Sequence, residues 1–419
     1  YEKLEQTINI AAIDVHGFTP GLFTVVAADN TTTLGAVGDL NAGVGSGNLN
    51  VLISAGAVLD LSGTQGGSAV PANDYSKLGT LLFGDAAATL NVAGTGANLA
   101  LAGTLNGNGT DDFGILNVVN TLGNTATFTS TIGNTKRLAA VNVGTTNNEA
   151  AANGIAVFTG AVKSSVIHVG GHAGAANAGG SGTATFNGVG NIANAGFLVG
   201  GNANAANNGG DGSAEFGAGA TLTITAGGLK VGGNGVGAAG AAGTGKIVFG
   251  VDANLIVTAG GITLGGAGGD ANAGVVGTNG GAVAAGTSFG GTVLVSAGGL
   301  KIGGAGGAGS TANDGVAGGN GGSTAANATF VKMVTLGAGT AVNIGGAGGA
   351  GNAGAGGGAA GGNGGTAVAI FAGGLKADTL TVGGNAGAHN TGNGGAGGAG
   401  TVTFTAALTN TDGAGRPTV

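Results

Sequence analysis

The sequence GGLKVGGNG at residues 227–235 contains the pattern that decides the fold, a short strand enclosed by glycine pairs. It returns nearly unchanged as GGLKIGGAG at residues 298–306, and a third GGLK begins at residue 373. Side chains alternate across a β-strand, so Leu229 and Val231 point to one face and Lys230 to the other. Glycine takes positive φ without steric cost and turns the chain sharply. We therefore expect a strand that buries Leu229 and Val231, exposes Lys230 and ends in a corner on each side.

The same unit recurs along most of the chain, with its strand kept and its length varied. The last apolar residue before each glycine pair is a repeat anchor, and the anchors are Val169, Val199, Val231, Leu264, Ile302, Ile344 and Val382. Their spacing of 30 to 42 residues indicates a constant strand followed by a loop of variable length. A second strand then follows, such as GTATF at residues 182–186 or GKIVF at residues 245–249, with apolar residues at period two.

These units predict an all-β repeat protein. Each unit holds two or three short strands that cannot bury a face alone, whereas stacking equivalent positions would align Val, Ile, Leu and Phe into ladders. The chain has 103 Gly, yet 42% of its residues are hydrophobic and 7% are charged, which favours order over disorder. The sequence therefore predicts a parallel β-solenoid that rises about 4.8 Å per rung.

The glycine tracts have their own period of three, as in GGAGGAG at residues 303–309 and 394–400. This period matches the three residues per turn of a polyproline-II-type helix, and collagen is excluded because the chain has only 3 Pro. Two interpretations stay open. The tracts are either loops that bulge from each rung, or extended glycine helices of successive units packed into a second layer, and the recurrence of the tracts favours the layer.

Changes in glycine density divide the chain into three parts. Residues 1–160, where strands are closer together and more apolar, are predicted to form a compact solenoid segment with a cap. Residues 161–405 form the glycine-rich repeat solenoid, and residues 406–419 a C-terminal tail. The stretch TINIAAIDV at residues 7–15 is either a capping strand or a segment exchanged with another subunit.

Three lysines occur in the recurring GGLK sequence, namely Lys230, Lys301 and Lys376. Their separations are about two units each, so we expect them to lie in a row on one surface. A row of lysines either solvates a strand edge, which we favour, or forms a binding site.

Motifs for reaction chemistry are weak throughout the chain. Residues 240–246 match the start of a P-loop, but Ile247 stands where Ser or Thr would hold magnesium. His168 and His172 are four residues apart without a helix to place them on one face or a third zinc ligand. NGNGTDDFGIL at residues 106–116 matches a calcium-binding nonapeptide only once, whereas such sites need tandem copies. The sequence therefore predicts no catalytic residue, no cofactor and no metal site, and hence no enzyme.

Charge and composition also limit the partners. The net charge of −7 leaves no basic face for nucleic acid, and the chain has no cysteine. The first residue is Tyr1, and no apolar run is long enough for a signal peptide or a membrane span, so we expect a processed or excised chain.

The low charge, the absence of cysteine and strands such as ATFTSTIGNTKRLAAVNVG and GIAVFTGAVKSSVIHVGG resemble the passenger of a Gram-negative autotransporter. The repeat style is similar to that of the rickettsial surface antigens, outer membrane proteins A and B. The resemblance implies a right-handed β-helix displayed outside the cell. Tracts such as GGNGG are also similar to the glycine-rich domains of PE-PGRS surface proteins, although that family's helical N-terminal domain has no counterpart here.

The functional expectation is a non-catalytic, extracellular cell-surface protein with a structural or adhesive role. Its partner would be a receptor on a host or cell surface. The alternative is a self-assembling subunit of an extracellular filament or surface layer, whose partner would be further copies of itself. A ligand-binding role would need an aromatic-lined groove, and the chain has no Trp and only 2 Tyr to build one.

Overall fold

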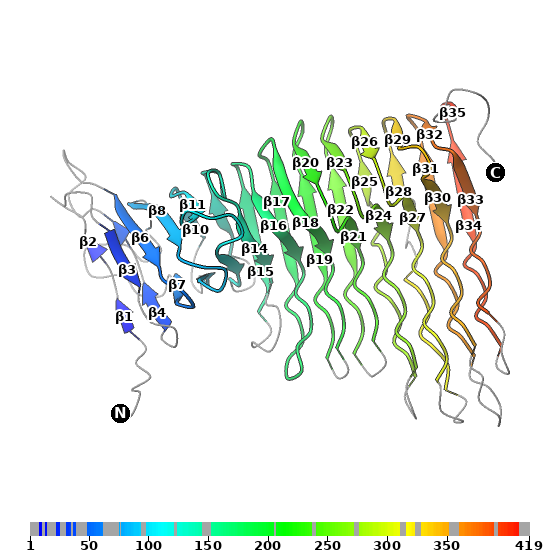
Figure 1. Ribbon diagram of the computed structural model, residues 1–419, viewed down its shortest axis with the longest axis horizontal. Helices are drawn as coiled ribbons and strands as arrows, with labels where there is room; N and C mark the ends of the chain where they lie inside the picture. Colours follow the sequence, from blue (N-terminus) through cyan, green and yellow to red (C-terminus); the bar gives the residue numbers. More distant parts are fainter. Residues whose placement is uncertain are drawn as a thin grey trace.

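The chain folds into β-strands that lie side by side along one axis, with β1 (Ile8–Ile10) and β35 (Leu408–Thr409) at opposite ends (Figure 1). Every regular element among the described residues is a strand. The computed structural model describes residues 8–10, 13–14, 22–25, 31–34, 37–38, 48–61, 75, 77–93, 98–120, 124–144, 152–204, 207–236, 240–271, 276–310, 316–322, 328–351, 360–388 and 393–409.

One sheet contains one strand from each of ten successive units, all paired in parallel. Its strands are β10 (Leu99–Leu101), β13 (Ala126–Phe128), β15 (Gly154–Phe158), β17 (Gly182–Phe186), β19 (Gly212–Phe216), β22 (Gly245–Phe249), β25 (Ser288–Phe289), β28 (Ala328–Phe330), β31 (Ala367–Phe371) and β34 (Gly400–Phe404).

A 19-stranded sheet runs along the whole described chain and divides into two rows at β18 (Asn191–Val199), which pairs with both β20 and β21. The N-terminal strands are β1 (Ile8–Ile10), β4 (Thr31–Leu34), β7 (Val58–Leu61), β9 (Thr89–Val92), β12 (Ile115–Val118), β14 (Leu138–Val143) and β16 (Lys163–Val169). The first row continues with β20 (Thr221–Ile224), β23 (Asn254–Val257), β26 (Val293–Val295), β29 (Val334–Leu336), β32 (Leu375–Lys376) and β35 (Leu408–Thr409). The second row, next to the glycine tracts, continues with β21 (Leu229–Val231), β24 (Ile262–Leu264), β27 (Leu300–Ile302), β30 (Ala341–Ile344) and β33 (Thr379–Val382).

Two small parallel sheets complete the N-terminal part. The larger contains β3 (Leu22–Val25), β6 (Leu49–Ile53), β8 (Leu78–Phe83) and β11 (Leu105–Gly107), and the smaller contains β2 (Ile13–Asp14) and β5 (Val37–Gly38). The predicted all-β class with long parallel sheets is therefore present, and it is compatible with a β-solenoid. Of residues 7–15, β1 pairs with β4 of the same chain. Of the predicted tail, residues 410–419 lie outside the described part.

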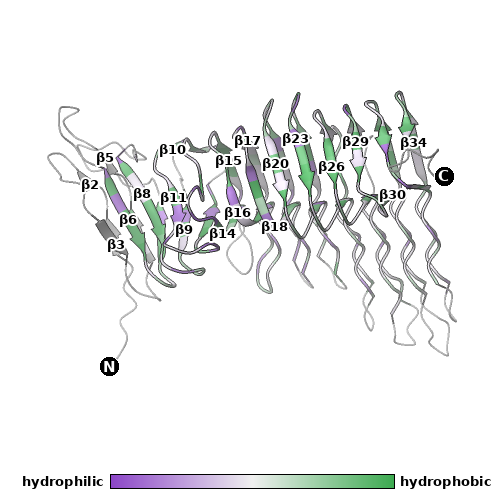
Figure 2. Ribbon diagram, turned by 45° about the horizontal axis from the view of Figure 1, so that its top comes forward, coloured by the Kyte–Doolittle hydropathy of each residue, from purple (hydrophilic) through white to green (hydrophobic). Residues whose placement is uncertain are grey.

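The core is built from ladders in which residues at equivalent positions of successive units stack on one another, because these units pair in register. Figure 2 shows the hydrophobic colouring concentrated on the strands. One ladder is a phenylalanine stack at the ends of the strands of the ten-stranded sheet, with ring centroids 4.4–5.4 Å apart and planes within 19° of parallel. Its members are Phe128, Phe158, Phe186, Phe216, Phe249, Phe289, Phe330, Phe371 and Phe404. Offset stacking of this kind stabilises aromatic pairs beyond the area that they bury.

The repeat anchors form a second ladder on the opposite sheet. The registers place them opposite one another in the order Val169, Val199, Val231, Leu264, Ile302, Ile344 and Val382. The first six anchors are fully buried, whereas Val382 is 38% exposed. No strand pairs with the far side of β33 among the described residues, so the last anchor has a neighbour on one side only.

Each glycine tract leaves the sheet after an anchor as an outgoing leg and comes back as a return leg, and Figure 1 shows the tracts as long hairpin-like extensions. The Gly346 N–H of one outgoing leg donates to the Gly365 carbonyl of its return leg at 2.9 Å. The Gly365 N–H donates in turn to Gly304 of the preceding unit at 2.8 Å, and the Gly398 N–H of the following unit donates to Gly346 at 2.7 Å. Corresponding bonds link the legs of successive units from Gly171 to Gly398.

Neighbouring legs are also bonded side by side, for example from the Gly348 N–H to the Asn385 carbonyl at 2.8 Å. Burial follows a period of three along a leg, as at residues 361–366, where two buried glycines precede each exposed residue. A Cβ added at Gly364 would lie 1.8 Å from the Gly346 carbonyl oxygen, so only glycine permits this approach. The hydrogen bonds of the legs thus replace those of a β-ladder.

Candidate functional site

A groove of about 430 Å³ lies where the second strand row meets the glycine tracts. One side consists of outward-facing side chains of successive strands, and the floor consists of the glycines that follow the anchors. We call this hollow the axial groove. The strand side contains Lys230, Thr263, Lys301, Asn343 and Thr381, and the glycine side contains Asn234, Ala267, Ala305, Ala347 and Asn385.

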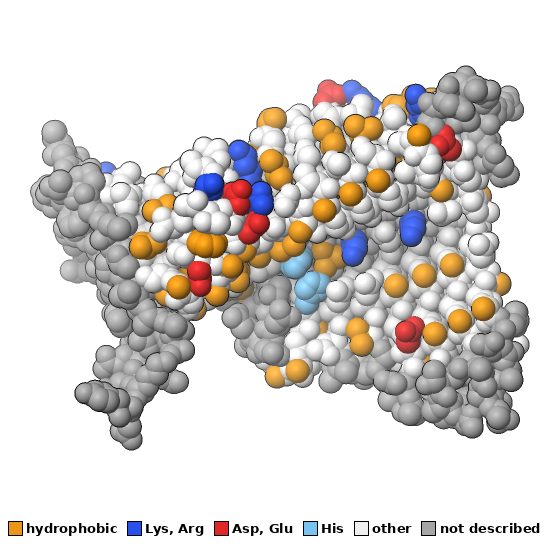
Figure 3. Space-filling view, in the orientation of Figure 1, with side chains coloured by type: hydrophobic (Ala, Val, Ile, Leu, Met, Phe, Trp, Pro, Cys, Tyr) orange, Lys and Arg blue, Asp and Glu red, His pale blue; other side chains and the backbone are white. Residues whose placement is uncertain are grey.

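The strand side of the groove is one register row. Lys230 pairs with Thr263, and Thr263 pairs with Lys301 on the next strand, so the two ammonium groups belong to strands two rungs apart. At a strand spacing of about 4.8 Å, this places their backbones about 10 Å apart. Both lysines are exposed, and Figure 3 shows few charged side chains on this face.

The predicted lysine row is wrong in its third member. Lys376 lies on β32 and pairs with Thr335, so it belongs to the first strand row and not to the row of Lys230 and Lys301. The reason is that a further strand, β33, stands between the third GGLK and its glycine tract. Thr381 of β33 occupies the position that the spacing assigns to Lys376.

Side chains of one unit cap the backbone of the next on the glycine side. The Asn234 N–H donates to Asn202 Oδ1 at 2.8 Å, and the Ala267 N–H donates to Asn234 Oδ1 at 3.0 Å. Ala267, Ala305 and Ala347 have no side-chain acceptor to offer to the next unit. Consequently the backbone N–H groups of Ala305, Ala347 and Asn385 have no partner among the described residues.

A smaller hollow of about 190 Å³ continues the groove toward the N-terminus and shares Lys230 and Asn234 with it. Its lining includes His168 and His172, whose rings meet edge to face with centroids 4.8 Å apart. The Asn202 N–H donates to His172 Nδ1 at 2.9 Å, so this nitrogen must be unprotonated. Burial is the main cause that lowers the pKa of both imidazoles, that of His168 to about 4, and His172 adds a smaller repulsion to His168.

Acid is expected to weaken the fold around this histidine pair. An imidazole whose pKa falls on folding contributes stability that is complete above its unfolded pKa, near 6.5, and is lost as the pH drops toward the folded value of about 4. Allowing for partial exposure, we expect a loss of about 2 kcal/mol between pH 7 and pH 4. Thermal melts of the wild type and of the His168→Gln/His172→Gln double variant over this range test it. Parallel pH profiles for the two proteins would contradict the assignment.

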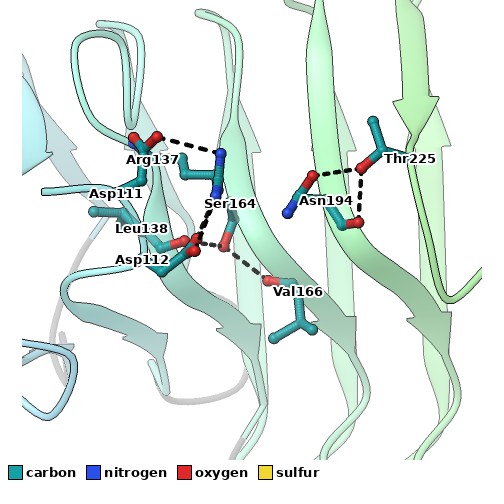
Figure 4. Close-up of polar contacts among 8 residues, drawn as sticks. All are labelled: Asp111, Asp112, Arg137, Leu138, Ser164, Val166, Asn194 and Thr225. Carbon is teal, nitrogen blue, oxygen red and sulfur yellow. Dashed lines mark hydrogen bonds and ion pairs between the residues drawn. The ribbon is translucent and has the colours of Figure 1, made fainter.

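The acidic pair Asp111 and Asp112 is held by an arginine of the next unit (Figure 4). The Arg137 guanidinium donates to both carboxylate oxygens of Asp112, at 2.6 and 2.9 Å, and to Asp111 Oδ2 at 3.3 Å. The hydrogen bond from Arg137 is the main cause that lowers the pKa of Asp112. Asp112 has φ of 65°, a left-handed conformation that the guanidinium contact helps to hold. The nonapeptide-like sequence therefore forms an ion-pair clamp in this structure.

Replacing Arg137 with alanine is expected to destabilise this part of the chain by about 1 kcal/mol, because Asp112 loses a bidentate partner and Asp111 a single contact at a half-exposed site. Arg137→Lys should recover only part of the loss, since an ammonium cannot form the planar double contact. Denaturation midpoints measure both effects. The wild-type midpoint should be the same with calcium and with a chelator, and a rise with calcium would contradict the clamp.

The remaining motif matches do not assemble into a site. Gly243, inside the P-loop-like stretch, donates its N–H to the Gly201 carbonyl at 2.9 Å, and Lys246 lies on β22 of the other sheet. In the described part of the chain, no three His, Asp or Glu side chains gather closely enough to hold a metal ion. Nor does any described segment form a helix that could cross a membrane.

Sequence inspection missed the polar row that leads into the groove. Asn91, Asn117 and Asn142 each donate a side-chain N–H to the acceptor of the preceding rung, and the first acceptor is Asp60 Oδ1. The register continues from Asn142 to His168 and so to the start of the groove. The sequence pattern that marks this row is present in the strands VLDL, TLNV, ILNV and LAAVNV, which carry Asp or Asn one residue before the last apolar residue.

Comparison with protein-family models, with curated proteins and with solved structures finds no match to this chain.

Proposed function

We propose that the chain is a non-catalytic, extracellular surface protein with a structural or adhesive role. The observation that carries the proposal is the repetition of strands along one axis. The strand rows of the 19-stranded sheet present equivalent outward-facing positions at each rung. Such arrays bury a continuous core with modules of only two or three strands and offer an extended face to other molecules. The resemblance to autotransporter passengers supports display outside the cell.

The proposed architecture is a closed right-handed β-solenoid carrying a second layer of three-residue-per-turn glycine helices. The hydrogen bonds between successive legs and the period of three in burial support this layer. Because every leg is bonded to its neighbours, the layer would stiffen the molecule along its length. A rigid rod is suited to carrying a surface or adhesive face away from its attachment point.

Electron microscopy and small-angle scattering of the purified chain test the architecture. The proposal expects separate elongated particles whose length does not change with concentration. Antibody labelling and protease treatment of intact producing cells test the location, and digestion only after lysis would contradict it. A compact sphere in the images would contradict the solenoid independently of where the protein is found.

The alternative, a self-assembling subunit, rests on the last described rung. β33, β34 and β35 each have a strand partner on one side only among the described residues, and Val382 is exposed there. Unpaired strand edges promote pairing with another chain. Filaments that lengthen with concentration would favour this function over the single surface rod. The Val382→Lys variant should suppress such filaments because it places a charge at the exposed anchor.

A further inference from the structure

We propose that the axial groove binds a linear acidic polysaccharide, with the carboxylates of the polymer beside Lys230 and Lys301. The inference deepens the proposed surface role by naming the class of ligand. It rests on two observations, which are the two lysines and free backbone donors of the groove and its length over several units.

The groove combines positive charge with free backbone donors, beside Asn and Thr side chains that both donate and accept. The ammonium groups of Lys230 and Lys301 can only donate, and the free backbone N–H groups of Ala305, Ala347 and Asn385 lie along the opposite side. No Asp or Glu is among the described residues that line the groove. An occupant must therefore be rich in acceptors and negatively charged, which describes a polymer of uronic acids.

The length of the groove favours an extended polymer over a compact anion. From Lys230 to Thr381 the lining covers four strand steps, a distance of about 19 Å. The two lysines stand two rungs apart, and an extended sugar chain advances by a similar distance per residue as one rung. The glycine floor carries no side chains, so a flat sugar backbone can approach it closely.

The same lining disfavours other macromolecules. Single-stranded nucleic acid is held by aromatic stacking platforms, and none of the described residues that line the groove is aromatic. A peptide strand would need alternating donors and acceptors, whereas the carbonyls of Ala305, Ala347 and Asn385 already accept hydrogen bonds from the preceding unit. Asp270 lies farther along the glycine tract and is not among the described residues that line the groove. Its carboxylate accepts a hydrogen bond from the Ala308 N–H at 2.7 Å.

Binding of polygalacturonate fragments, measured by calorimetry at low and high salt, tests the inference on the full chain. The Lys230→Gln/Lys301→Gln variant should bind about tenfold more weakly, a loss of about 1.4 kcal/mol shared by two exposed ion pairs. The control variant Lys246→Gln/Lys376→Gln has the same net charge but changes lysines outside the groove, and it should bind like the wild type. A neutral glucan of the same length should not bind.

The backbone donors have a separate test. Ala347→Pro deletes one free N–H, and the fixed φ of proline suits an extended backbone of three-residue period. It should weaken binding about threefold, whereas Ala347→Val keeps the N–H and should not. Equal losses in the groove and control lysine variants, equal binding of the neutral glucan, or no binding of polygalacturonate would each overturn the inference. Any of these results leaves the elongated particle shape, and hence the surface role, untouched.

Discussion

Replacing Gly346 with alanine is expected to destabilise the hydrogen-bonded glycine legs by about 3 kcal/mol or more. A Cβ at this position would lie 1.9 Å from the Gly304 carbonyl oxygen and 2.8 Å from the Gly365 nitrogen, both backbone atoms. The legs must then separate, which strains or breaks the hydrogen bonds that Gly346 makes to Gly365 and Gly398. Losing buried backbone hydrogen bonds without new partners costs about 1–3 kcal/mol for each group.

Hydrogen exchange of the legs at residues 345–351 and 360–366 measures the effect locally, and thermal denaturation measures it for the whole chain. Protection should fall in these legs and in the return leg at residues 393–399, while the N-terminal sheets keep theirs. Ala347→Ser is the matched control, because Ala347 is next to Gly346 and its own side chain is exposed. Unchanged protection in Gly346→Ala would contradict the close packing of the legs.

The second large effect is expected at the centre of the phenylalanine stack. Phe249→Ala should destabilise the protein by about 3–4 kcal/mol, because truncating a buried aromatic ring loses its transfer free energy and leaves a cavity. Phe249 is 2% exposed and stacks on Phe216 at 4.4 Å and on Phe289 at 5.3 Å. Chemical denaturation followed by circular dichroism gives the change in unfolding free energy.

Phe404→Ala is the control for this prediction. Phe404 is the last member of the stack, is partly buried and has one stacked neighbour, Phe371, at 5.4 Å. Its truncation should cost less than half as much as that of Phe249. Equal losses at the two positions would show that burial between two rings is not what stabilises the stack. The loss of unfolding free energy in Phe249→Leu should lie between the losses in Phe249→Ala and Phe404→Ala, because leucine keeps much of the buried volume.

Local patterns were sufficient for the strands and for their inward faces. Alternation within LKV and LKI predicts buried residues on both sides of an exposed lysine, as found for Lys230 and Lys301. The recurrence of the anchors predicts their common ladder, since each unit keeps the distance from strand to glycine pair. These features depend on interactions within one unit or on simple repetition, and both are visible in a single sequence.

The groove could not be predicted in the same way. Lys376 resembles the other two lysines in its local sequence, yet an additional strand before its glycine tract moves it to another row. The cap from Asn202 to the Asn234 N–H joins residues 32 positions apart, and no local pattern marks which asparagine reaches a neighbouring backbone. The free N–H groups of Ala305 and Ala347 arise from what the preceding unit lacks, which becomes apparent only in register.

The sequence by itself determined the β-strands, the repeat and the residues that enter the core, because side-chain alternation and glycine corners act over a few residues. The tertiary structure alone decided which rows lie side by side, how the glycine legs bond to one another and where the axial groove opens. The physical reason is that each unit completes its hydrogen bonds and its packing with the units before and after it. Register between units, rather than the content of any one unit, thus places Lys230, Lys301 and the free backbone donors along one groove.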